Sequence, residues 1–362
     1  MRILVVNWKD PQDPTTGGAE EYARQMAEIW ALQGHQVDLL VPRRRGQAHE
    51  ETIGGVRYIR NGPRVAIFAV ARSYARRHIN DYDVMVELVS TRPFFLHEIA
   101  GDRASTLYLQ PAKDVWSLEF RPPISWMGRY FLEPRWLRRL KGARLISISP
   151  STSAALVAEG LEVEAVVPPG CDMPPADAGP RRLGEPPRLA YLGRVVRTKR
   201  TGDAVEAFEI VRRRHAGATL DVIGTGYLLE ELEARPHPGV TYHGFVSTEQ
   251  KDRILSTTDV LLIPGTREGW GIVAIEAAVR GIPVVAYDIP GLRDAVVNGT
   301  TGILTEPSPA AMAEAALNLV ANAPQWGAMS RNAMTRGRGY TWEATSAGVL
   351  EAATGSAPGA PR

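Results

Sequence analysis

The sequence predicts an α/β protein made of two doubly wound, Rossmann-like domains that flank a cleft. Three observations lead to this prediction. Short apolar runs alternate with helix-like segments, a Pro/Gly-dense stretch divides the chain near its middle, and 362 residues exceed one ordinary core. Such alternation implies parallel sheets covered on both faces, and ligands of such folds bind at the carboxyl ends of the strands.

The elements follow in the same order in both halves. In the first half, a helix over 19–33 ends at Gly34, and short apolar runs predict strands at 3–6, 37–41, 84–88, 106–109 and 145–148. In the second half, a helix over 272–280 ends before Gly281-Ile-Pro283, and strands are predicted at 188–192, 220–223, 240–243, 260–263 and 283–286.

The domain boundaries come from composition. The run 169–187 is rich in Pro and Gly and lacks periodicity, which indicates a linker. We therefore expect a first domain over 1–168 and a second over 188–335, followed by a helix over 336–353 that packs back toward the first domain. Small polar residues predict a disordered tail over 354–362.

Composition excludes several classes of protein. A hydrophobic content of 44%, a charged content of 23% and a net charge of +2 are ordinary for a globular protein and do not favour nucleic-acid binding. The single Cys171 excludes an internal disulfide and a cysteine metal cluster, and it fits a reducing, cytoplasmic compartment. The first apolar run is too short for a signal peptide, and no run of 18 apolar residues predicts a membrane span.

The stretch Glu268-Gly-Trp-Gly-Ile-Val-Ala-Ile-Glu276 is the most informative motif. Glu268 follows a predicted strand, and Gly269 and Gly271 let the backbone turn sharply and approach a ligand. Amides at the next helix start bind phosphate well, and Glu276 returns about one turn later. One carboxylate can hold sugar hydroxyls and the other ribose hydroxyls. The alternative is two glutamates placed favourably near the positive end of a helix dipole.

Two other loops offer groups for a phosphate. In Thr15-Thr-Gly-Gly-Ala-Glu20, glycine amides can face an anion, or a threonine simply caps the helix. After the first strand of the second domain, Arg194 and Lys199 can converge on a diphosphate and offset its charge without a metal. A solvated basic loop is the alternative.

Three further features have simpler interpretations. Val222-Ile-Gly-Thr-Gly226 lacks the third glycine of a dinucleotide fingerprint, which argues against a dehydrogenase. Asp81 and Asp83 are interpreted as a helix end, not as a metal site. The segment 124–144 mixes aromatic and basic residues; we expect a surface helix packed on the first domain, with peripheral membrane contact left open.

Taken in order, these motifs resemble glycosyltransferase family four, the retaining nucleotide-sugar transferases of GT-B fold. The chain has 37 Arg and only 5 Lys, a bias that resembles that of actinobacterial proteins. The resemblance covers nearly the whole chain. It rests on Gly17-Gly-Ala-Glu20, Gly34-His-Gln-Val37, Ile148-Ser-Pro-Ser-Thr152, Pro169-Gly-Cys-Asp172, Gly193-Arg194 with Lys199, Gly224-Thr-Gly226, His243-Gly-Phe-Val246, and Glu268 and Glu276 with Gly281-Ile-Pro-Val284.

The resemblance implies a role for each matching residue. Gly18 looks like an amide that touches the donor diphosphate, and Arg194 and Lys199 look like its cations. Glu268 is similar to the group that holds the transferred sugar, and Glu276 to the ribose-binding glutamate. The remaining donor-binding positions implied are Gly17, Gly224, Val246 at the nucleobase, Gly269, Trp270, Gly271, Ile272 and Val273. The implied reaction retains the anomeric configuration and needs neither metal nor cofactor.

One departure from the family affects the acceptor side. Related enzymes carry a histidine after a strand of the first domain, whereas the equivalent stretch 106–116 contains none. Gln110 stands at or next to that position and is our fourth candidate catalytic residue, with Glu268, Arg194 and Lys199. His97 is nearest in sequence, and we interpret it as a surface residue.

The leading hypothesis is an enzyme that moves a sugar from a nucleoside diphosphate to a small acceptor. A sulfur nucleophile, as in S-glycosylation of a natural product, is one acceptor; an alcohol activated by the departing phosphate is the other. An epimerase or hydrolase on the same scaffold, and a binding protein that has lost transfer, are the alternatives.

Overall fold

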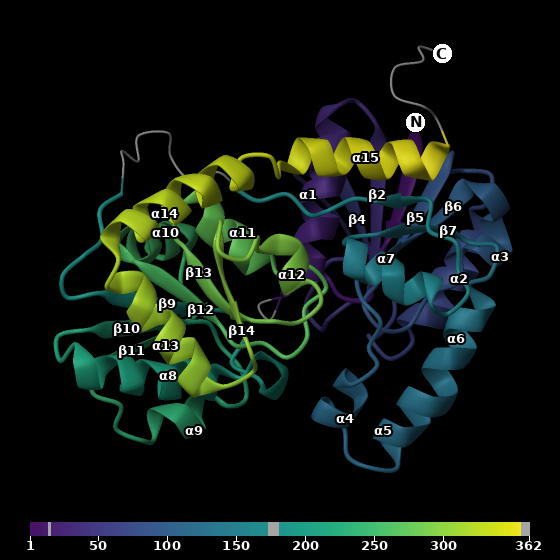
Figure 1. Ribbon diagram of the computed structural model, residues 1–362. Coiled ribbons are helices and arrows are strands. Elements are labelled where there is room, and N and C mark those ends of the chain that lie inside the picture. The colour runs from purple at the N-terminus through teal and green to yellow at the C-terminus, as the bar shows by residue number, and fades with distance from the viewer. Residues whose placement is uncertain (14–15, 173–180, 356–362) are drawn as a thin grey trace. The chain divides into compact units, whose positions relative to one another are not determined.

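The computed structural model describes residues 1–13, 16–172 and 181–355, which form two compact units. Unit 1 comprises Met1–Gly170 and Trp342–Arg362, and unit 2 comprises Cys171–Thr341. Each unit is built on its own largely parallel sheet with flanking helices (Figure 1). The predicted α/β class with two Rossmann-like domains is confirmed.

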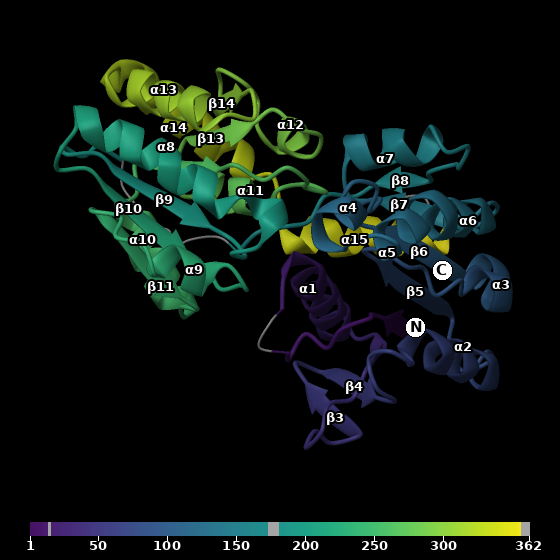
Figure 2. The same cartoon turned by 90° about the horizontal axis from the view of Figure 1, so that it is seen from below.

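The sheet of unit 1 has eight strands in the order β3-β4-β2-β1-β5-β6-β7-β8, and Figure 2 shows β3 and β4 at one edge. All neighbours are parallel except β3 and β4, which form a hairpin. The strands are β1 (Arg2–Val6), β2 (Gln36–Val41), β3 (Glu50–Ile53), β4 (Val56–Arg60), β5 (Val84–Val89), β6 (Ala104–Tyr108), β7 (Arg144–Ser147) and β8 (Ala165–Val166). The strands predicted in this half lie within one or two residues of β1, β2, β5, β6 and β7.

The helices of unit 1 connect these strands and flank the sheet. They are α1 (Gly18–Leu32), α2 (Ile67–Arg77), α3 (His97–Ala100), the 3-10 turn η1 (Gly101–Arg103), α4 (Val115–Glu119), α5 (Ile124–Trp126), the π-helical turn η2 (Met127–Leu132), α6 (Glu133–Arg139), α7 (Pro150–Val157) and α15 (Trp342–Thr354).

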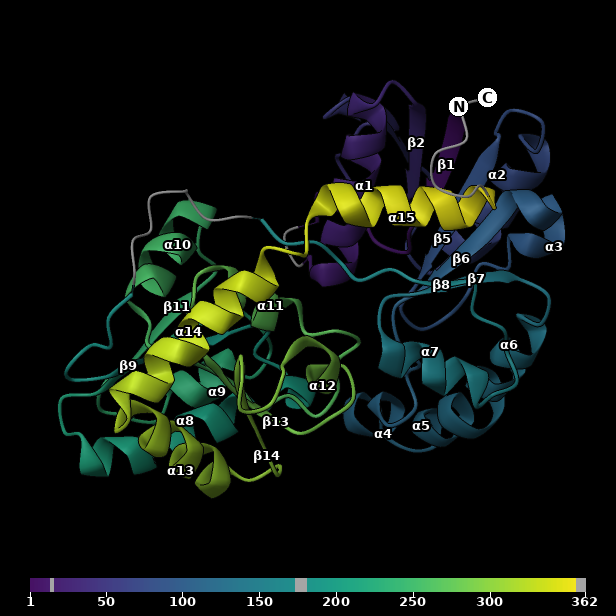
Figure 3. The ribbon, with the colours of Figure 1, turned by 45° about the horizontal axis from the view of Figure 1, so that its top comes forward.

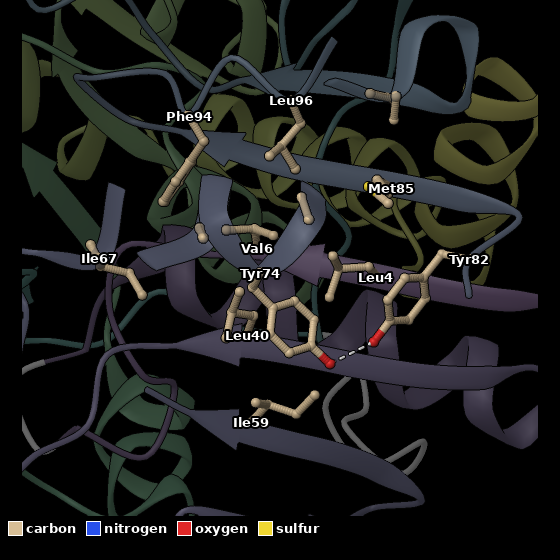
Figure 4. Packing of buried hydrophobic residues seen from close by; sticks show 14 residues of the cluster. Leu4, Val6, Leu40, Ile59, Ile67, Tyr74, Tyr82, Met85, Phe94 and Leu96 are labelled. Carbon is tan, nitrogen blue, oxygen red and sulfur yellow. Dashed lines mark hydrogen bonds between the residues drawn. The ribbon is translucent and has the colours of Figure 1, made fainter. Parts of the chain in front are cut away.

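A buried cluster under α2 forms much of the unit 1 core (Figure 4). Leu4 and Leu40, which are fully buried, pack there beside the rings of Tyr74 and Tyr82. The two hydroxyls lie 3.0 Å apart, and the Tyr82 hydroxyl donates to Asp38 at 2.6 Å. Burial of these hydroxyls is thus compatible with stability because each has a polar partner.

The helix expected over 336–353 is two helices. Residues up to Gly337 end α14 of unit 2, and α15 belongs to unit 1, where it lies along α1 (Figure 3). The Trp30 indole donates to the carbonyl of Ser346 at 2.9 Å, and Trp342 packs edge-on against Tyr22. Of the expected tail, residues from 356 onward lie outside the described part of the chain, and Thr354 still ends α15.

The sheet of unit 2 has six parallel strands in the order β11-β10-β9-β12-β13-β14. The strands are β9 (Arg188–Leu192), β10 (Thr219–Ile223), β11 (Val240–Gly244), β12 (Val260–Ile263), β13 (Val284–Tyr287) and β14 (Gly302–Thr305). The helices are the 3-10 turn η3 (Arg197–Lys199), α8 (Thr201–Arg214), α9 (Leu229–Glu233), α10 (Thr248–Thr257), α11 (Ile272–Val279), α12 (Leu292–Ala295), α13 (Pro309–Val320) and α14 (Ala323–Gly337).

Residues 181–187, the second described part of the expected linker, are attached to unit 2. Asp259, which is buried just before β12, accepts hydrogen bonds from the amides of Gly184 at 2.9 Å and Arg188 at 2.8 Å. The boundary between the units falls between Gly170 and Cys171, near the start of the stretch 169–187, of which residues 173–180 lie outside the description.

Candidate active site

The loop after β12 carries the first motif glutamate. β12 is fully apolar and buried, and α11 begins at Ile272, as predicted for a strand–turn–helix unit. Gly271 caps α11 with φ +89°, and a Cβ there would lie 2.8 Å from the Leu292 side chain. Glycine is favoured here, because the positive φ strains any other residue and a Cβ would force the Leu292 side chain to shift. Glu268 is thereby held on the turn.

Gly291 supports the same turn from the neighbouring element. It precedes α12 with φ +81°, and a Cβ there would lie 2.3 Å from the backbone carbonyl oxygen of Glu268. The close approach of the two backbones fixes where Glu268 leaves the sheet. The sequence analysis missed Gly291, although its Pro290-Gly291 dipeptide is a turn signal.

Lys199 and Glu268 form an ion pair through Nζ and Oε1. They come from loops that follow β9 and β12, which are adjacent parallel strands, so both loops leave the sheet at its carboxyl edge. The Thr266 amide donates to the Thr198 carbonyl at 3.0 Å and joins the two loops. The exposed fractions are 23% for Lys199 and 12% for Glu268, so solvent still reaches the pair.

Arg194 lies on the same loop after β9 and is exposed. Within the described residues no carboxylate pairs with its guanidinium. The loop is fixed by its backbone: the Val195 amide donates to the Thr225 carbonyl at 2.8 Å, and a Cβ on Gly224 would lie 1.9 Å from the Gly193 carbonyl oxygen. Gly224, predicted to bind the donor, thus has a packing role that alone requires glycine.

A second lysine–glutamate pair lies between α10 and α11. Lys251 Nζ is 2.5 Å from Glu276 Oε1, and both side chains are mostly buried. Burial alone would lower the pKa of Lys251, but the Glu276 carboxylate outweighs this effect and raises it. Lys251 was not among the predicted site residues; two of the chain's five lysines pair with the two motif glutamates.

The remaining predicted residues of unit 2 differ in accessibility. Ile272 and Val273, in the first turn of α11, are half-buried, as is Gly269, and Val246 directly precedes the Ser247 cap of α10. The Trp270 indole is 3% exposed and packs edge-on against Tyr340 with ring centroids 5.3 Å apart, and its buried Nε1 has no hydrogen-bond partner among the described residues.

The predicted residues of unit 1 lie at the starts of α1 and after β6. Gly17 caps α1, but its amide already donates to Glu20 at 2.8 Å, whereas Gly18 is exposed. Thr15 lies outside the described residues. Gln110 follows β6, and its buried Oε1 accepts no hydrogen bond among the described residues. An oxygen in this state can accept a hydrogen bond from a ligand.

The remaining candidates from the sequence, His97 and the pair Asp81 and Asp83, make contacts within unit 1. His97 is half-buried, and its Nε2 lies 3.2 Å from the Arg139 carbonyl oxygen. Asp81 Oδ2 lies 2.7 Å from His78 Nδ1 at the end of α2, as the helix-end interpretation predicts, whereas Asp83 accepts from the Arg2 amide of β1 at 2.8 Å. The described residues contain no group of three or more His, Cys, Asp or Glu side chains placed to hold a metal ion.

The segment 124–144 is helical without a gap from Ile124 to Arg139, with a π-helical turn η2 between α5 and α6, and this helical stretch ends before β7. Leu137 and Leu140 pack into the core, whereas Trp126, Tyr130 and Phe131 are 60–70% exposed. Among the helices in the described parts of the chain, none has the length and apolarity needed to cross a membrane.

Comparison with known proteins identifies the class. Residues 17–170 match the family "Glycosyl transferase 4-like domain", and residues 186–322 match "Glycosyl transferases group 1". The chain is a glycosyltransferase with the GT-B fold. It is similar to the glycogen synthase of Mycobacterium tuberculosis, with 27% identity over 90% of this chain and 87% of the relative. It is also similar to the D-inositol 3-phosphate glycosyltransferase of Arthrobacter, with 32% identity over 59% of this chain and 56% of the relative.

Solved structures agree on the fold of the glycosyltransferase. The sucrose-phosphate synthase of Thermosynechococcus elongatus superposes with a TM-score of 0.77 at 21% identity, covering 97% of both chains. WaaG, described as a glycosyltransferase of lipopolysaccharide biosynthesis, superposes with a TM-score of 0.73 at 16% identity, covering 98% of this chain and all of WaaG. The Lys199–Glu268 and Lys251–Glu276 pairs lie within the second domain, which matches "Glycosyl transferases group 1".

Proposed function

We propose that the protein is a retaining, metal-independent glycosyltransferase that moves a sugar from a nucleoside-diphosphate sugar to a small acceptor. One observation carries the proposal. Lys199 pairs with Glu268 at the carboxyl edge of the unit 2 sheet, on the loop that also carries the exposed Arg194. This edge is where open α/β sheets bind their ligands.

The pair supplies the two groups that such a donor needs. An ammonium on a flexible stem can move from a carboxylate to a phosphate, because it bonds as a point charge without fixed geometry. When Lys199 turns to the diphosphate, Glu268 is released to accept hydrogen bonds from sugar hydroxyls. Lys251 likewise holds Glu276 in place for the ribose hydroxyls.

The transfer step is supported by the same groups. The bond between the anomeric carbon and the phosphate oxygen breaks while the acceptor attacks from the same face, and the departing phosphate takes the acceptor proton. Negative charge grows on the phosphate, where Arg194 and Lys199 stabilise it by charge-assisted hydrogen bonds. Two such cations can serve the leaving group without a metal.

Gln110 in place of a histidine supports an acceptor that reacts without a general base from the protein. It cannot act as a base, but its buried Oε1 can accept a hydrogen bond from the acceptor or from a sugar hydroxyl. An alcohol gains from a general base, whereas a thiol is intrinsically more nucleophilic and partly ionised. We therefore propose a small thiol or thione, with an alcohol activated by the departing phosphate as the second candidate.

The names of two relatives support a small acceptor. One is the D-inositol 3-phosphate glycosyltransferase, and another is the 2-deoxystreptamine glucosyltransferase of Streptomyces kanamyceticus, 30% identical over 48% of this chain. Cell-envelope or natural-product O-glycosylation is the broader alternative. Release of free sugar without an acceptor would favour a hydrolase, and tight donor binding with no turnover would favour a binding protein.

The first test is a thermal-shift screen of nucleoside diphosphates and their sugars, followed by calorimetry with the best nucleoside diphosphate. Lys199→Ala should weaken its binding by about one to two decades, because a charge-assisted bond contributes roughly 1.5–3 kcal/mol. Lys141→Ala, an exposed lysine of unit 1, is the matched control. Unchanged affinity in Lys199→Ala would remove this residue from the site.

The acceptor is tested with matched small thiol, thione and alcohol acceptors. We expect the sulfur acceptors to react faster, and Gln110→His to help alcohols more than thiols because it restores a base. If only alcohols are glycosylated and the histidine variant is markedly faster with them, the sulfur proposal is wrong.

A further inference from the structure

A hollow of about 280 Å³ lies in unit 1, and none of the predicted catalytic or donor-binding residues lines it. It is bounded by α2, by the loop that follows β5, and by the end of α6. Its walls include the side chains of Phe68, Arg72, Arg76, Arg92, Phe95 and Arg139. The volume is slightly below the roughly 300–1,000 Å³ of drug-sized ligand pockets, so it suits a small ligand.

The wall formed by the loop after β5 is held in one shape. Phe95 has φ +61°, a conformation that bulky residues rarely adopt. Arg72 Nη1 donates to the carbonyls of Phe94 at 2.9 Å and Phe95 at 2.7 Å, and the Phe94 amide donates to buried Glu87 at 2.8 Å. Phe94 itself points into the core (Figure 4). These contacts hold the loop wall of the pocket in place, while the side chains of Arg76 and Arg92 are exposed to solvent.

The charge in this pocket is unbalanced. Arg72 and Arg139 share Glu98, at 2.9 Å and 2.7 Å. For Arg92 and Arg76, by contrast, no carboxylate partner exists within the described parts of the chain. Burial and the nearby Arg139 lower the pKa of Arg92, as expected where positive charge is in excess.

Aromatic rings orient two of these guanidinium groups. Arg92 lies 4.5 Å from the ring centre of Phe68, and Arg139 lies 4.0 Å from that of Phe95. A guanidinium stacked on a ring keeps its N–H edge available for hydrogen bonds in its own plane. Such forks match the oxygens of a phosphate.

We propose that this pocket binds a phosphate monoester. A phosphate monoester dianion has three terminal oxygens and up to twice the charge of a carboxylate, so it can accept hydrogen bonds from the unpaired forks of Arg76 and Arg92 and offset both charges. The ester is either a small soluble phosphate, such as a phosphorylated polyol, or the headgroup of a membrane lipid. The site does not use the diphosphate cations Arg194 and Lys199, and it does not depend on the proposed transfer reaction.

The matched variants are Arg92→Gln, Arg76→Gln and, as the control, Arg77→Gln. Arg77 is the next residue on α2; it is exposed, bonds only weakly to the Ser73 carbonyl at 3.4 Å, and does not line the pocket. All three changes remove one positive charge, so a general effect of net charge appears equally in each. The probes are glucose 6-phosphate, glucose, and phosphatidylcholine vesicles with and without phosphatidic acid.

Calorimetry should detect glucose 6-phosphate but not glucose, with affinity about tenfold or more weaker in Arg92→Gln and Arg76→Gln and unchanged in Arg77→Gln. If vesicle binding instead shows this dependence on phosphatidic acid and on both arginines, the ester is a lipid headgroup. If neither glucose 6-phosphate nor the vesicles bind, the proposal is wrong. It is also wrong if all three variants weaken binding equally. A fourth variant, Arg194→Gln, tests the donor groups of unit 2. If this variant alone weakens binding of glucose 6-phosphate, the phosphate binds in unit 2 and the proposal is wrong.

Discussion

Glu87 should make the stability of unit 1 fall as pH rises. This residue lies in β5, is fully buried, and accepts hydrogen bonds from the Phe94 amide at 2.8 Å and the Thr106 hydroxyl at 2.7 Å. Burial raises the pKa of Glu87 to about 7, against the opposing effect of these donors. The folded protein therefore keeps a proton that the unfolded chain releases near its ordinary value of 4.5.

The sign follows from proton binding. Between these two pKa values the folded state binds more protons than the unfolded state, so the free energy of unfolding falls with pH in that window. A shift from 4.5 to about 7 corresponds to ~3 kcal/mol at most. The contribution is fully present below the unfolded pKa and is lost as pH rises through the folded one.

Glu87→Gln removes the titration and keeps the contacts. The amide oxygen can accept from Phe94, and the amide nitrogen can donate to the Thr106 hydroxyl. Near pH 5 the variant and the wild type should have similar stability; near pH 8 the variant should be more stable by up to ~3 kcal/mol. Urea unfolding at several pH values measures this difference, with the exposed Glu162→Gln as a control for the loss of one charge. A difference that does not change with pH, or that decreases, would refute the reasoning.

Three further predictions concern the donor site. Gly291→Ala should lower turnover at least about tenfold, because its Cβ meets the Glu268 carbonyl at 2.3 Å; Gly299→Ala, with φ +74° and open space, is the control for backbone strain alone. Equal turnover in the two variants would contradict this role. Lys251→Gln should weaken binding of the bare nucleoside diphosphate about tenfold by calorimetry, because Glu276 loses its partner, and Lys141→Gln should not. Transfer should persist in excess chelator, and complete loss that manganese or magnesium restores would overturn the metal-independent mechanism.

Much of the fold was predictable because parallel strands buried on both faces are continuous apolar runs. β12 is of this kind, with every residue apolar and buried, and β5 is apolar and buried apart from the buried Glu87. β3 and β4 were missed, although Gly54-Gly55 between them is a hairpin signal, because β3 is mostly exposed and polar. β14 was missed because only four residues form it and three are half-buried.

The site was predictable where its geometry is local. Glu268, Gly271 and Glu276 belong to one strand–turn–helix unit, whose order can be inferred from nearby glycines and apolar residues. Lys251 and Gly291 act on that unit from other elements, α10 and the start of α12, and no local pattern predicts such a contact. The packing of Trp270 was not predictable for a similar reason, since its partner Tyr340 lies after α14.

The most direct test of the central claim compares Glu276→Gln with Glu268→Gln in calorimetric titrations. The ligands are the bare nucleoside diphosphate and its sugar, and turnover is measured on the same samples. Glu276→Gln should weaken the binding of both ligands, because the ribose is common to them. Glu268→Gln should leave binding of the bare nucleotide unaffected and lower turnover. Equal loss of bare nucleotide binding in both variants would contradict the assignment of one carboxylate to the sugar and the other to the ribose.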